Sequence, residues 1–376
     1  MKVSVLGAGL VGGPMAMDLA RDNEFDVLVA DIDKDALERT KKRAPNITTI
    51  ESDLSDANAV KGVVAECDIV VSAVPGFMGF ETLKTIVSAG KPVVDIAFFG
   101  EDPFELDGLA KSNGVVAVVD CGVAPGMSNV LVSHADTMLD STISALIYVG
   151  GLPLVRTWPY EYKAGFSPVD VIEEYVRPAR FVENGELVTR PALSDPELVD
   201  FPGLGSLEAF NTDGLRSLAT TIDAPNLKEK TLRYPGHIEK MAVLRETGFF
   251  DETPIVVNGV EVKPVDFTSK LLFPKWKLEP NEVDITVMRI VVEGESSGSQ
   301  KRYVYELFDK ADRVTGVHSM ARTTGYTATV TVRLLSAGLY SKPGITPPEF
   351  IGRDPACVEF LLSGLKDRGV EFTTPE

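Results

Sequence analysis

Cysteine and histidine are scarce in this chain of 376 residues, which contains three of each. The cysteines Cys67, Cys121 and Cys357 are odd in number and far apart, so they indicate neither a disulfide framework nor a zinc site. The histidines show none of the short spacings that are typical of metal ligands. We therefore expect no metal site and a reducing, cytoplasmic environment.

Positive charge is also scarce, because 37 Lys and Arg residues stand against 55 Asp and Glu, a formal net charge of −18. Nucleic acids and anionic membranes are bound through basic surfaces, so we expect neither as a partner. No apolar run approaches the length of a membrane span, and we expect the first residues to lead into a strand rather than to form a signal peptide. The composition is that of a soluble globular protein with room for two or more domains.

Glycine is present in a specific context near the N-terminus. A short apolar strand at 3–6 leads into the loop 7–12, an amphipathic helical pattern follows, and a second apolar strand occupies 26–30. This order is the dinucleotide-binding fingerprint of a Rossmann fold, whose glycines permit the turn, the approach of a pyrophosphate and close helix packing. A glycine-rich turn without chemical use is the weaker alternative. The loop residues expected to contact the cofactor are Gly7, Gly9, Leu10, Val11 and Gly12.

Asp31 follows the second strand, where a carboxylate can accept both hydroxyls of an adenosine ribose. A 2′-phosphate would face this carboxylate, so the sequence favours NAD over NADP. Lys34 could still reach such a phosphate, which keeps NADP as the less favoured alternative. Glu51 or Asp53, after the third strand, could meet the adenine amino group.

Strands and helices alternate as far as residue 119, which predicts a parallel, doubly wound sheet. After Cys121 the pattern changes to longer β-prone segments, including an Asn184-Gly185 hairpin signal and two strands around a Gly/Ser-rich turn at 294–299. Helical patterns return at 323–337 and 354–364. We therefore expect an α/β fold with a Rossmann domain at 1–120. An inserted α+β domain with a mostly antiparallel sheet should occupy 121–320, and C-terminal helices at 321–376 should pack back on the Rossmann domain.

Polar residues follow the strands of the first domain, where ligands of open α/β sheets bind. Val74 and Pro75 follow the fourth strand, Asp95 ends the fifth, and Asp120 and Cys121 follow the sixth. Either aspartate alone could be a helix cap, but two at one edge favour an active site. Cys121 could be a nucleophile, although a small buried side chain lining the pocket is the favoured interpretation.

The second half contains a further polar group in the segment 231–237. Arg233 could hold a carboxylate with two hydrogen bonds, and His237 could titrate near neutrality. His134 falls within a helical pattern and is expected to be structural, whereas the role of His318 stays open.

Family-specific motifs extend along nearly the whole chain. They are GGLP at 150–153 followed by YK at 162–163, DCG at 120–122 with PG at 125–126, FSP at 166–168 with EY at 174–175, FNTDGLR at 210–216, TLRYPG at 231–236, RTTGY at 322–326 and PPE at 347–349. Together with the glycine loop, these motifs resemble the saccharopine dehydrogenase family and, within it, most of all the lysine 6-dehydrogenases.

The resemblance implies NAD-dependent oxidative deamination of an amino acid, first of all at the ε-amine of L-lysine. It also implies a homodimer formed through the middle domain, which would then serve both substrate binding and dimerisation. In saccharopine reductases the segment matching 211–213 carries an arginine where this chain has Thr212, which argues against the extra carboxylates of saccharopine. The catalytic residues implied are Asp95, Asp120, Cys121 and Tyr162, and the substrate-binding residues are Arg233, Thr212, His237 and Arg322, with Arg216 and Lys163 as further possible carboxylate ligands.

Two alternatives to this function stay open. The first is a saccharopine dehydrogenase or a related opine-type amino-acid dehydrogenase. The second is a non-catalytic NAD-binding regulator, which the polar residues after the strands disfavour.

Overall fold

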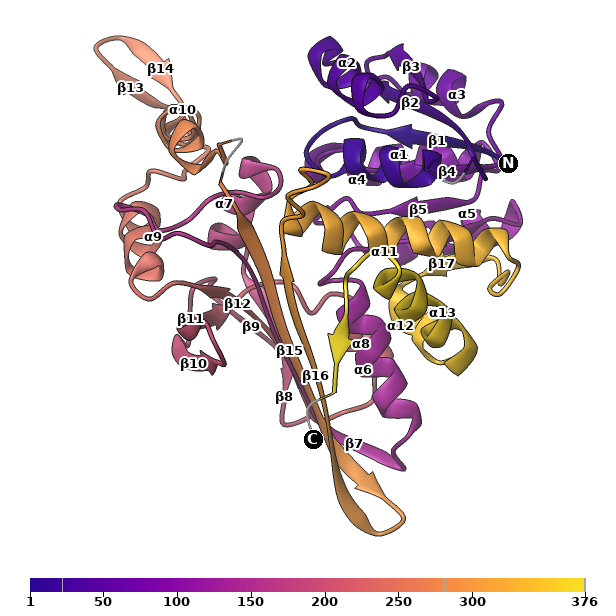
Figure 1. Ribbon diagram of the computed structural model, residues 1–376. Coiled ribbons are helices and arrows are strands. Elements are labelled where there is room, and N and C mark those ends of the chain that lie inside the picture. The colour runs from indigo at the N-terminus through magenta and orange to yellow at the C-terminus, as the bar shows by residue number, and fades with distance from the viewer. Residues whose placement is uncertain (22, 280–281, 375–376) are drawn as a thin grey trace. The chain divides into compact units, whose positions relative to one another are not determined.

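The computed structural model describes residues 1–21, 23–279 and 282–374, which form two compact units (Figure 1). Unit 1 combines Met1–Thr137 with Ala321–Phe372, and unit 2 contains Met138–Met320 together with the last residues from Thr373. The first boundary lies at residue 138 rather than at the expected residue 121. The reason is that helix α6 (Met127–Thr137) packs against α12 (Pro348–Gly352) and α13 (Pro355–Lys366), so it belongs to unit 1.

Unit 1 is built on a seven-stranded sheet with the order β17-β6-β5-β4-β1-β2-β3, in which every neighbouring pair is parallel. The Rossmann prediction is therefore confirmed. The seventh strand, β17, comes from the C-terminal segment, where only helices were expected. The strands are β1 (Lys2–Leu6), β2 (Asp26–Asp31), β3 (Thr48–Glu51), β4 (Ile69–Ser72), β5 (Val93–Asp95), β6 (Val116–Val118) and β17 (Gly344–Thr346), and the helices between them are α1 (Gly12–Ala20), α2 (Lys34–Arg43), α3 (Ala57–Val64), α4 (Gly76–Ser88) and α5 (Asp107–Ser112).

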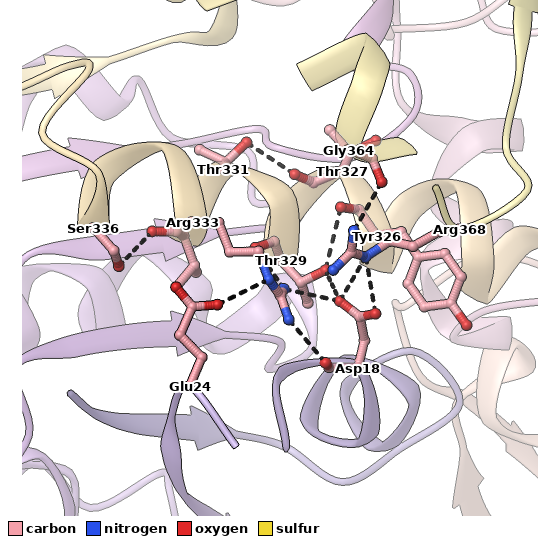
Figure 2. A network of polar contacts seen from close by, with 11 residues as sticks. Asp18, Glu24, Tyr326, Thr327, Thr329, Thr331, Arg333, Ser336, Gly364 and Arg368 are labelled. Carbon is pink, nitrogen blue, oxygen red and sulfur yellow. Dashed lines mark hydrogen bonds and ion pairs between the residues drawn. The ribbon is translucent and has the colours of Figure 1, made fainter. Parts of the chain in front are cut away.

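A buried carboxylate joins the C-terminal helices to the first helix of unit 1, as Figure 2 shows. Asp18 of α1 accepts hydrogen bonds from Arg333 Nη1 at 3.0 Å and from Arg368 Nε at 2.9 Å. The hydroxyl of Thr329 donates a further bond to Asp18 at 2.6 Å. Arg333 and Thr329 lie on α11 (Ser319–Ser336), and Arg368 follows α13. Because two guanidinium groups share one buried carboxylate, this network fixes α11 and the end of α13 against α1.

Unit 2 is built on a nine-stranded mixed sheet with the order β10-β11-β12-β7-β15-β16-β18, to which β8 and β9 attach beside β12. Strands β12 and β7 pair in parallel, whereas β11 and β15 pair antiparallel on either side of them. A second, inserted sheet domain was predicted, and the observed mixed sheet confirms it. The strands are β7 (Ser141–Pro153), β8 (Ala179–Glu183), β9 (Glu186–Arg190), β10 (Glu197–Phe201), β11 (Gly205–Asn211), β12 (Asn226–Arg233), β15 (Asp284–Ser296), β16 (Ser299–Lys310) and β18 (Phe372–Thr373).

Helices of unit 2 pack together over an apolar core that includes Trp276, Tyr175 and Phe210. They are α7 (Pro168–Val176), α9 (His237–Glu246) and α10 (Pro264–Trp276), and the short α8 (Leu218–Thr221) lies elsewhere in the unit. The predicted turn between β8 and β9 is confirmed, since Asn184 and Gly185 both have positive φ. The turn expected at 294–299 is shorter, because β15 and β16 pair as far as Ser296 and Ser299.

Candidate active site

The glycine loop of unit 1 leaves space for a phosphate at one position and none at two others. A Cβ on Gly7 would lie 2.7 Å from the Ala73 carbonyl oxygen, and a Cβ on Gly12 would lie 2.2 Å from that of Gly7. A Cβ on Gly9 would meet nothing within 4 Å. Gly7 and Gly12 are thus required by packing. Among the residues that the structure describes, Gly9 faces open space just before α1, and Val11 provides no side-chain cap for that helix. Free N–H groups and the helix dipole at such a position suit a pyrophosphate. The geometry of the loop therefore agrees with the dinucleotide binding that its glycine pattern predicts.

Asp31 ends β2 with its carboxylate turned toward this loop. Its Oδ2 accepts the Ala8 N–H at 2.6 Å and its Oδ1 accepts the Asp33 N–H at 2.8 Å. A carboxylate has about four acceptor positions, so two remain for ribose hydroxyls. Lys34, the cation that could have met a 2′-phosphate, has its Nζ 3.0 Å from Glu51 Oε2 instead.

The remaining cofactor candidates lie at the same sheet edge. Val74 and Pro75 follow β4, and Pro75 precedes α4 as its N-cap. Asp53 follows β3 but is exposed, and its carboxylate accepts the hydroxyl and N–H of Ser55, bonds that lower its pKa. Asp53 therefore shapes the turn before α3, and its proposed contact with adenine stays a prediction.

Three buried candidates meet where β5 and β6 end. Asp95 is fully buried, Asp120 is buried with a φ of 51°, and the Cys121 N–H donates to the Asp95 carbonyl at 3.0 Å. The Cys121 thiol donates to the Thr331 hydroxyl, and burial, together with the charges of Asp95 and Asp120, raises its pKa to about 12. The thiol stays protonated at neutral pH, which supports the pocket-lining interpretation over the nucleophile.

A cluster of polar and aromatic side chains is buried in unit 2 around Arg233 of β12. Its Nη2 donates to Glu174 Oε2 at 2.6 Å, its Nε lies 3.4 Å from the Tyr175 hydroxyl, and its guanidinium stacks 4.6 Å from the centre of the Tyr162 ring. Arg233 was expected to hold a substrate carboxylate, but the structure already gives it an internal carboxylate partner. Burial raises the pKa of Tyr162 well above its usual value, so this phenol stays protonated and cannot serve as a base at neutral pH.

His237 begins α9 beside Arg233, and its hydrogen bonds fix its protonation state. Nδ1 lies 2.8 Å from the Tyr160 carbonyl oxygen, which can only accept, so Nδ1 carries the proton. Nε2 then accepts the hydroxyl of Tyr175 at 2.9 Å. Burial, with the nearby charge of Arg233, lowers the His237 pKa to about 3. The expectation that His237 titrates near neutrality is therefore wrong, because it is buried as a neutral ring next to a cation.

Thr212 lies beside an acid that the sequence did not single out. Its hydroxyl donates to Glu229 Oε2 at 2.6 Å and lies 2.8 Å from the hydroxyl of Thr231. Glu229 is buried on β12, on the same face as Arg233, and among the described residues it has no cationic partner. Burial raises its pKa to about 8, and the nearby charge of Glu174 adds to the effect.

The remaining candidate side chains make hydrogen bonds or ion pairs with other residues of their own units. Arg322 donates to the carbonyls of Arg368 and Gly369 at 3.1 Å, within the C-terminal part of unit 1. Lys163 lies 3.1 Å from Glu282, and His318 Nδ1 lies 3.3 Å from Asp284 Oδ1. A substrate role for Arg322, or for Lys163, would require these contacts to change.

The structure thus brings the predicted residues together in two sets. Asp95, Asp120 and Cys121 meet in unit 1, while Arg233, His237, Tyr162 and Thr212 share the buried cluster of unit 2. Sequence reasoning missed Glu174 and Glu229 as members of that cluster. Strand alternation is the signal that could have found Glu229, because it lies four residues before Arg233 and therefore shares a face of β12 with the cation that the sequence singled out.

In the part of the chain that the structure describes, no group of three or more His, Cys, Asp or Glu side chains is placed to hold a metal ion. Within the same residues, no helix combines the length and apolarity needed to cross a membrane.

Two family models match nearly all of the chain. The model described as "Saccharopine dehydrogenase NADP binding domain" matches residues 3–118, and "Saccharopine dehydrogenase C-terminal domain" matches residues 122–370.

Curated relatives match at low identity. Saccharopine dehydrogenase (NADP(+), L-glutamate-forming) of Pyricularia oryzae is 26% identical over 322 residues, covering 80% of this chain and 69% of that protein. The mitochondrial alpha-aminoadipic semialdehyde synthase of Mus musculus is 26% identical over 285 residues, but this chain spans only 31% of it. Carboxyaminopropylagmatine dehydrogenase of Synechocystis sp. is 22% identical, with 97% of this chain and 96% of that protein covered.

A solved structure shares the fold over its full length. Apo saccharopine dehydrogenase (L-Glu forming) of Saccharomyces cerevisiae superimposes with a TM-score of 0.80 at 20% identity, covering all of both chains. With the two family models, this places the chain in the saccharopine dehydrogenase family, whose members are NAD(P)-dependent oxidoreductases acting on CH–NH donors.

Proposed function

We propose that this protein is an NAD-dependent dehydrogenase of a cationic amino acid, oxidising the ε-carbon of L-lysine. The observation that carries the proposal is the buried Glu229 beside Thr212. Saccharopine has three carboxylates and would need several cations around it. The cluster of unit 2 instead offers two acids, Glu174 and Glu229, and one guanidinium that is already paired.

Charge balance explains why such a cluster suits lysine. A buried carboxylate without a cation is costly, and the raised pKa of Glu229 expresses that cost. The α-ammonium of the substrate, which does not react, would supply the missing charge. The N–H groups of Arg233 that contact neither Glu174, Tyr175 nor the Leu232 carbonyl can meet the single α-carboxylate. Asp95 and Asp120 are the proposed proton acceptors, since the reacting amine must be neutral before it is oxidised.

The reaction balances without a metal or a covalent enzyme intermediate. The bound dinucleotide supplies the acceptor for the hydride that leaves the amine-bearing carbon. Loss of one hydride from the neutral amine gives an iminium ion, and water converts it to the semialdehyde and ammonium. The protein contributes binding, orientation and proton transfer.

The residues around Asp31 support NAD as the cofactor. Asp31, Asp33 and Glu51 place three carboxylates at this edge of unit 1, and Lys34 is held by Glu51. We expect Asp31→Ser to weaken NAD binding and to improve the NADP/NAD ratio of kcat/KM by roughly 10-fold or more, since it removes both the ribose acceptor and the repulsion of a phosphate. The control is Asp26→Ser, at the exposed opposite end of β2. A wild-type enzyme that prefers NADP would contradict the assignment.

A second candidate substrate is carboxyaminopropylagmatine. The match to the Synechocystis enzyme of that name covers nearly all of both chains, and the guanidinium of an agmatine unit is also a cation that Glu229 could hold. Both candidate substrates require an acid in the buried cluster of unit 2. They differ in length and in the group that is oxidised.

A substrate panel tests the proposal. NADH formation is measured with L-lysine, ornithine, diaminopimelate, saccharopine and carboxyaminopropylagmatine, and Glu229→Gln is compared with Glu186→Gln on the exposed strand β9. We expect activity with lysine and a KM that Glu229→Gln raises roughly 10- to 100-fold, the equivalent of about 1.5–3 kcal/mol for a charged hydrogen bond. Oxidation of saccharopine but not of lysine would overturn the proposal.

The proposal extends to a cytoplasmic homodimer. All three cysteines are free and buried, which suits a reducing compartment, and the family resemblance implies the dimer.

A further inference from the structure

The segment that runs from Asp251 to the start of α10 is an excursion that adds nothing to the core of unit 2. Its ends are tied together by a hydrogen bond from the Val265 N–H to the Asp251 carbonyl at 3.1 Å. Between them, every residue from 251 to 261 is exposed. The excursion forms the two-stranded ribbon of β13 (Ile255–Val257) and β14 (Val260–Val262), which extends beyond α10 in Figure 1. Isolated two-stranded ribbons are marginally stable in water, so this one needs a partner.

The ribbon is apolar although it is exposed. Ile255, Val256, Val257 and Val260 are between 48% and 70% exposed. On α10, Phe267 and Leu271 are also more than half exposed, and their spacing of four residues places them on one face of the helix. Exposed apolar side chains gathered on neighbouring elements in this way are typical of a protein interface.

The two edges of the ribbon differ in charge. Within the described residues each strand pairs only with the other, with Val256 opposite Glu261. Proteins commonly protect an open strand edge with a charged residue, and Glu261 does so for β14. No charged residue lies in β13, and residues 253–260 contain none at all. The outer edge of β13 is therefore the open one.

A second copy of this chain fits that edge. An antiparallel pairing about a two-fold axis would set Val256 opposite itself and Ile255 of one copy opposite Val257 of the other, with no like charges facing. The same pairing through β14 would set Glu261 opposite itself. Since each chain carries a net charge of −18, a charge-free surface is also where two copies repel each other least.

We propose that the outer edge of β13 pairs with the same edge of a second copy, joining the two ribbons into one four-stranded sheet in the homodimer. This inference rests on the homodimer proposed above, and it names the surface that forms it. Three-residue strands alone bury less surface than a stable interface needs. Phe267 and Leu271 would add to the surface that the two copies bury.

Opposite charges at Val256 test the two-fold pairing. We expect wild-type protein to sediment as a dimer, and Val256→Lys and Val256→Glu each to raise the dimer dissociation constant at least 100-fold, because each places like charges face to face. An equimolar mixture of the two variants should recover the dimer. The control is Val314→Lys, the same substitution at a 95% exposed valine elsewhere in unit 2, and circular dichroism checks that every variant is folded.

Each other outcome overturns a defined part of the proposal. A monomeric wild type would overturn both the homodimer and the surface. A dimer that persists in Val256→Lys would overturn only the surface. Loss of the dimer in both variants without recovery in the mixture would exclude the two-fold pairing and leave the ribbon to a different contact. None of these results depends on which amino acid the enzyme oxidises.

Discussion

At the scale of single residues, the unusual group is Glu229, an acid buried in the middle of a strand with a hydroxyl as its side-chain partner. Its pKa rises from 4.5 to about 8, so the folded protein holds the proton that the unfolded chain releases. The stability that this proton provides is fully present below pH 4.5 and is lost as the pH rises through 8.

Glu229→Gln should therefore change how stability depends on pH. The free energy of unfolding of the wild type should fall by a few kcal/mol more than that of the variant between pH 5 and pH 9, since one pKa unit corresponds to about 1.4 kcal/mol. Urea unfolding of both proteins at several pH values measures the difference, with Glu186→Gln as the exposed control. If the free energy of unfolding depends on pH in the same way in the wild type and in Glu229→Gln, the carboxyl of Glu229 titrates normally.

The residues that the sequence identified and those it missed differ in a physical way. Gly7, Gly12 and Asp31 could be predicted because their roles depend on neighbours a few residues away or on the adjacent strand. Arg233 was noticed as a cation, but its partner Glu174 is 59 residues away and only the fold brings them together. The neutral state of His237 likewise follows from burial beside Arg233, which no local pattern contains.

At the scale of elements, strands β1, β2, β4, β5 and β6 could be predicted from runs of apolar residues between turns. Strand β17 could not, because its sequence Gly-Ile-Thr contains a single strongly apolar residue and it is recognised only by its pairing with β6. The β13–β14 ribbon carries an Asn258-Gly259 turn with positive φ at both residues, the same signal as at Asn184-Gly185, so it was predictable but was not predicted.

The contact between α1 and the C-terminal helices depends on one carboxylate. Asp18→Asn keeps the size of the side chain but leaves Arg333 and Arg368 without their shared charge partner in a buried position. We expect a loss of about 3–5 kcal/mol in the free energy of unfolding, as for other broken buried ion pairs, and a lower melting temperature by calorimetry. Asp26→Asn, which is exposed, is the control. A shift no larger than that of the control would mean that both guanidinium groups find other acceptors.

At the scale of the whole molecule, the chain leaves unit 1 after Thr137 and returns to it at Ala321. The inserted unit therefore separates two parts of one sheet, since β6 lies before the insertion and its neighbour β17 after it. The same holds for the Asp18 network, which joins α1 to residues more than 300 positions later. Unit 1 cannot complete its core until the last part of the chain has been synthesised.

This connectivity predicts how fragments behave. A fragment of residues 1–137 contains the whole glycine loop and Asp31, yet it lacks β17 and the arginines that neutralise buried Asp18. We expect it to show no cooperative thermal transition and no calorimetric NAD binding, because an uncovered strand edge and an unpaired buried carboxylate oppose its folding. Joining 1–137 to 321–374 through a flexible Gly/Ser linker restores both missing parts, and should restore a cooperative transition and NAD binding. Cooperative folding of 1–137 alone would show that the glycine loop and six strands suffice, and that the C-terminal segment only adds stability.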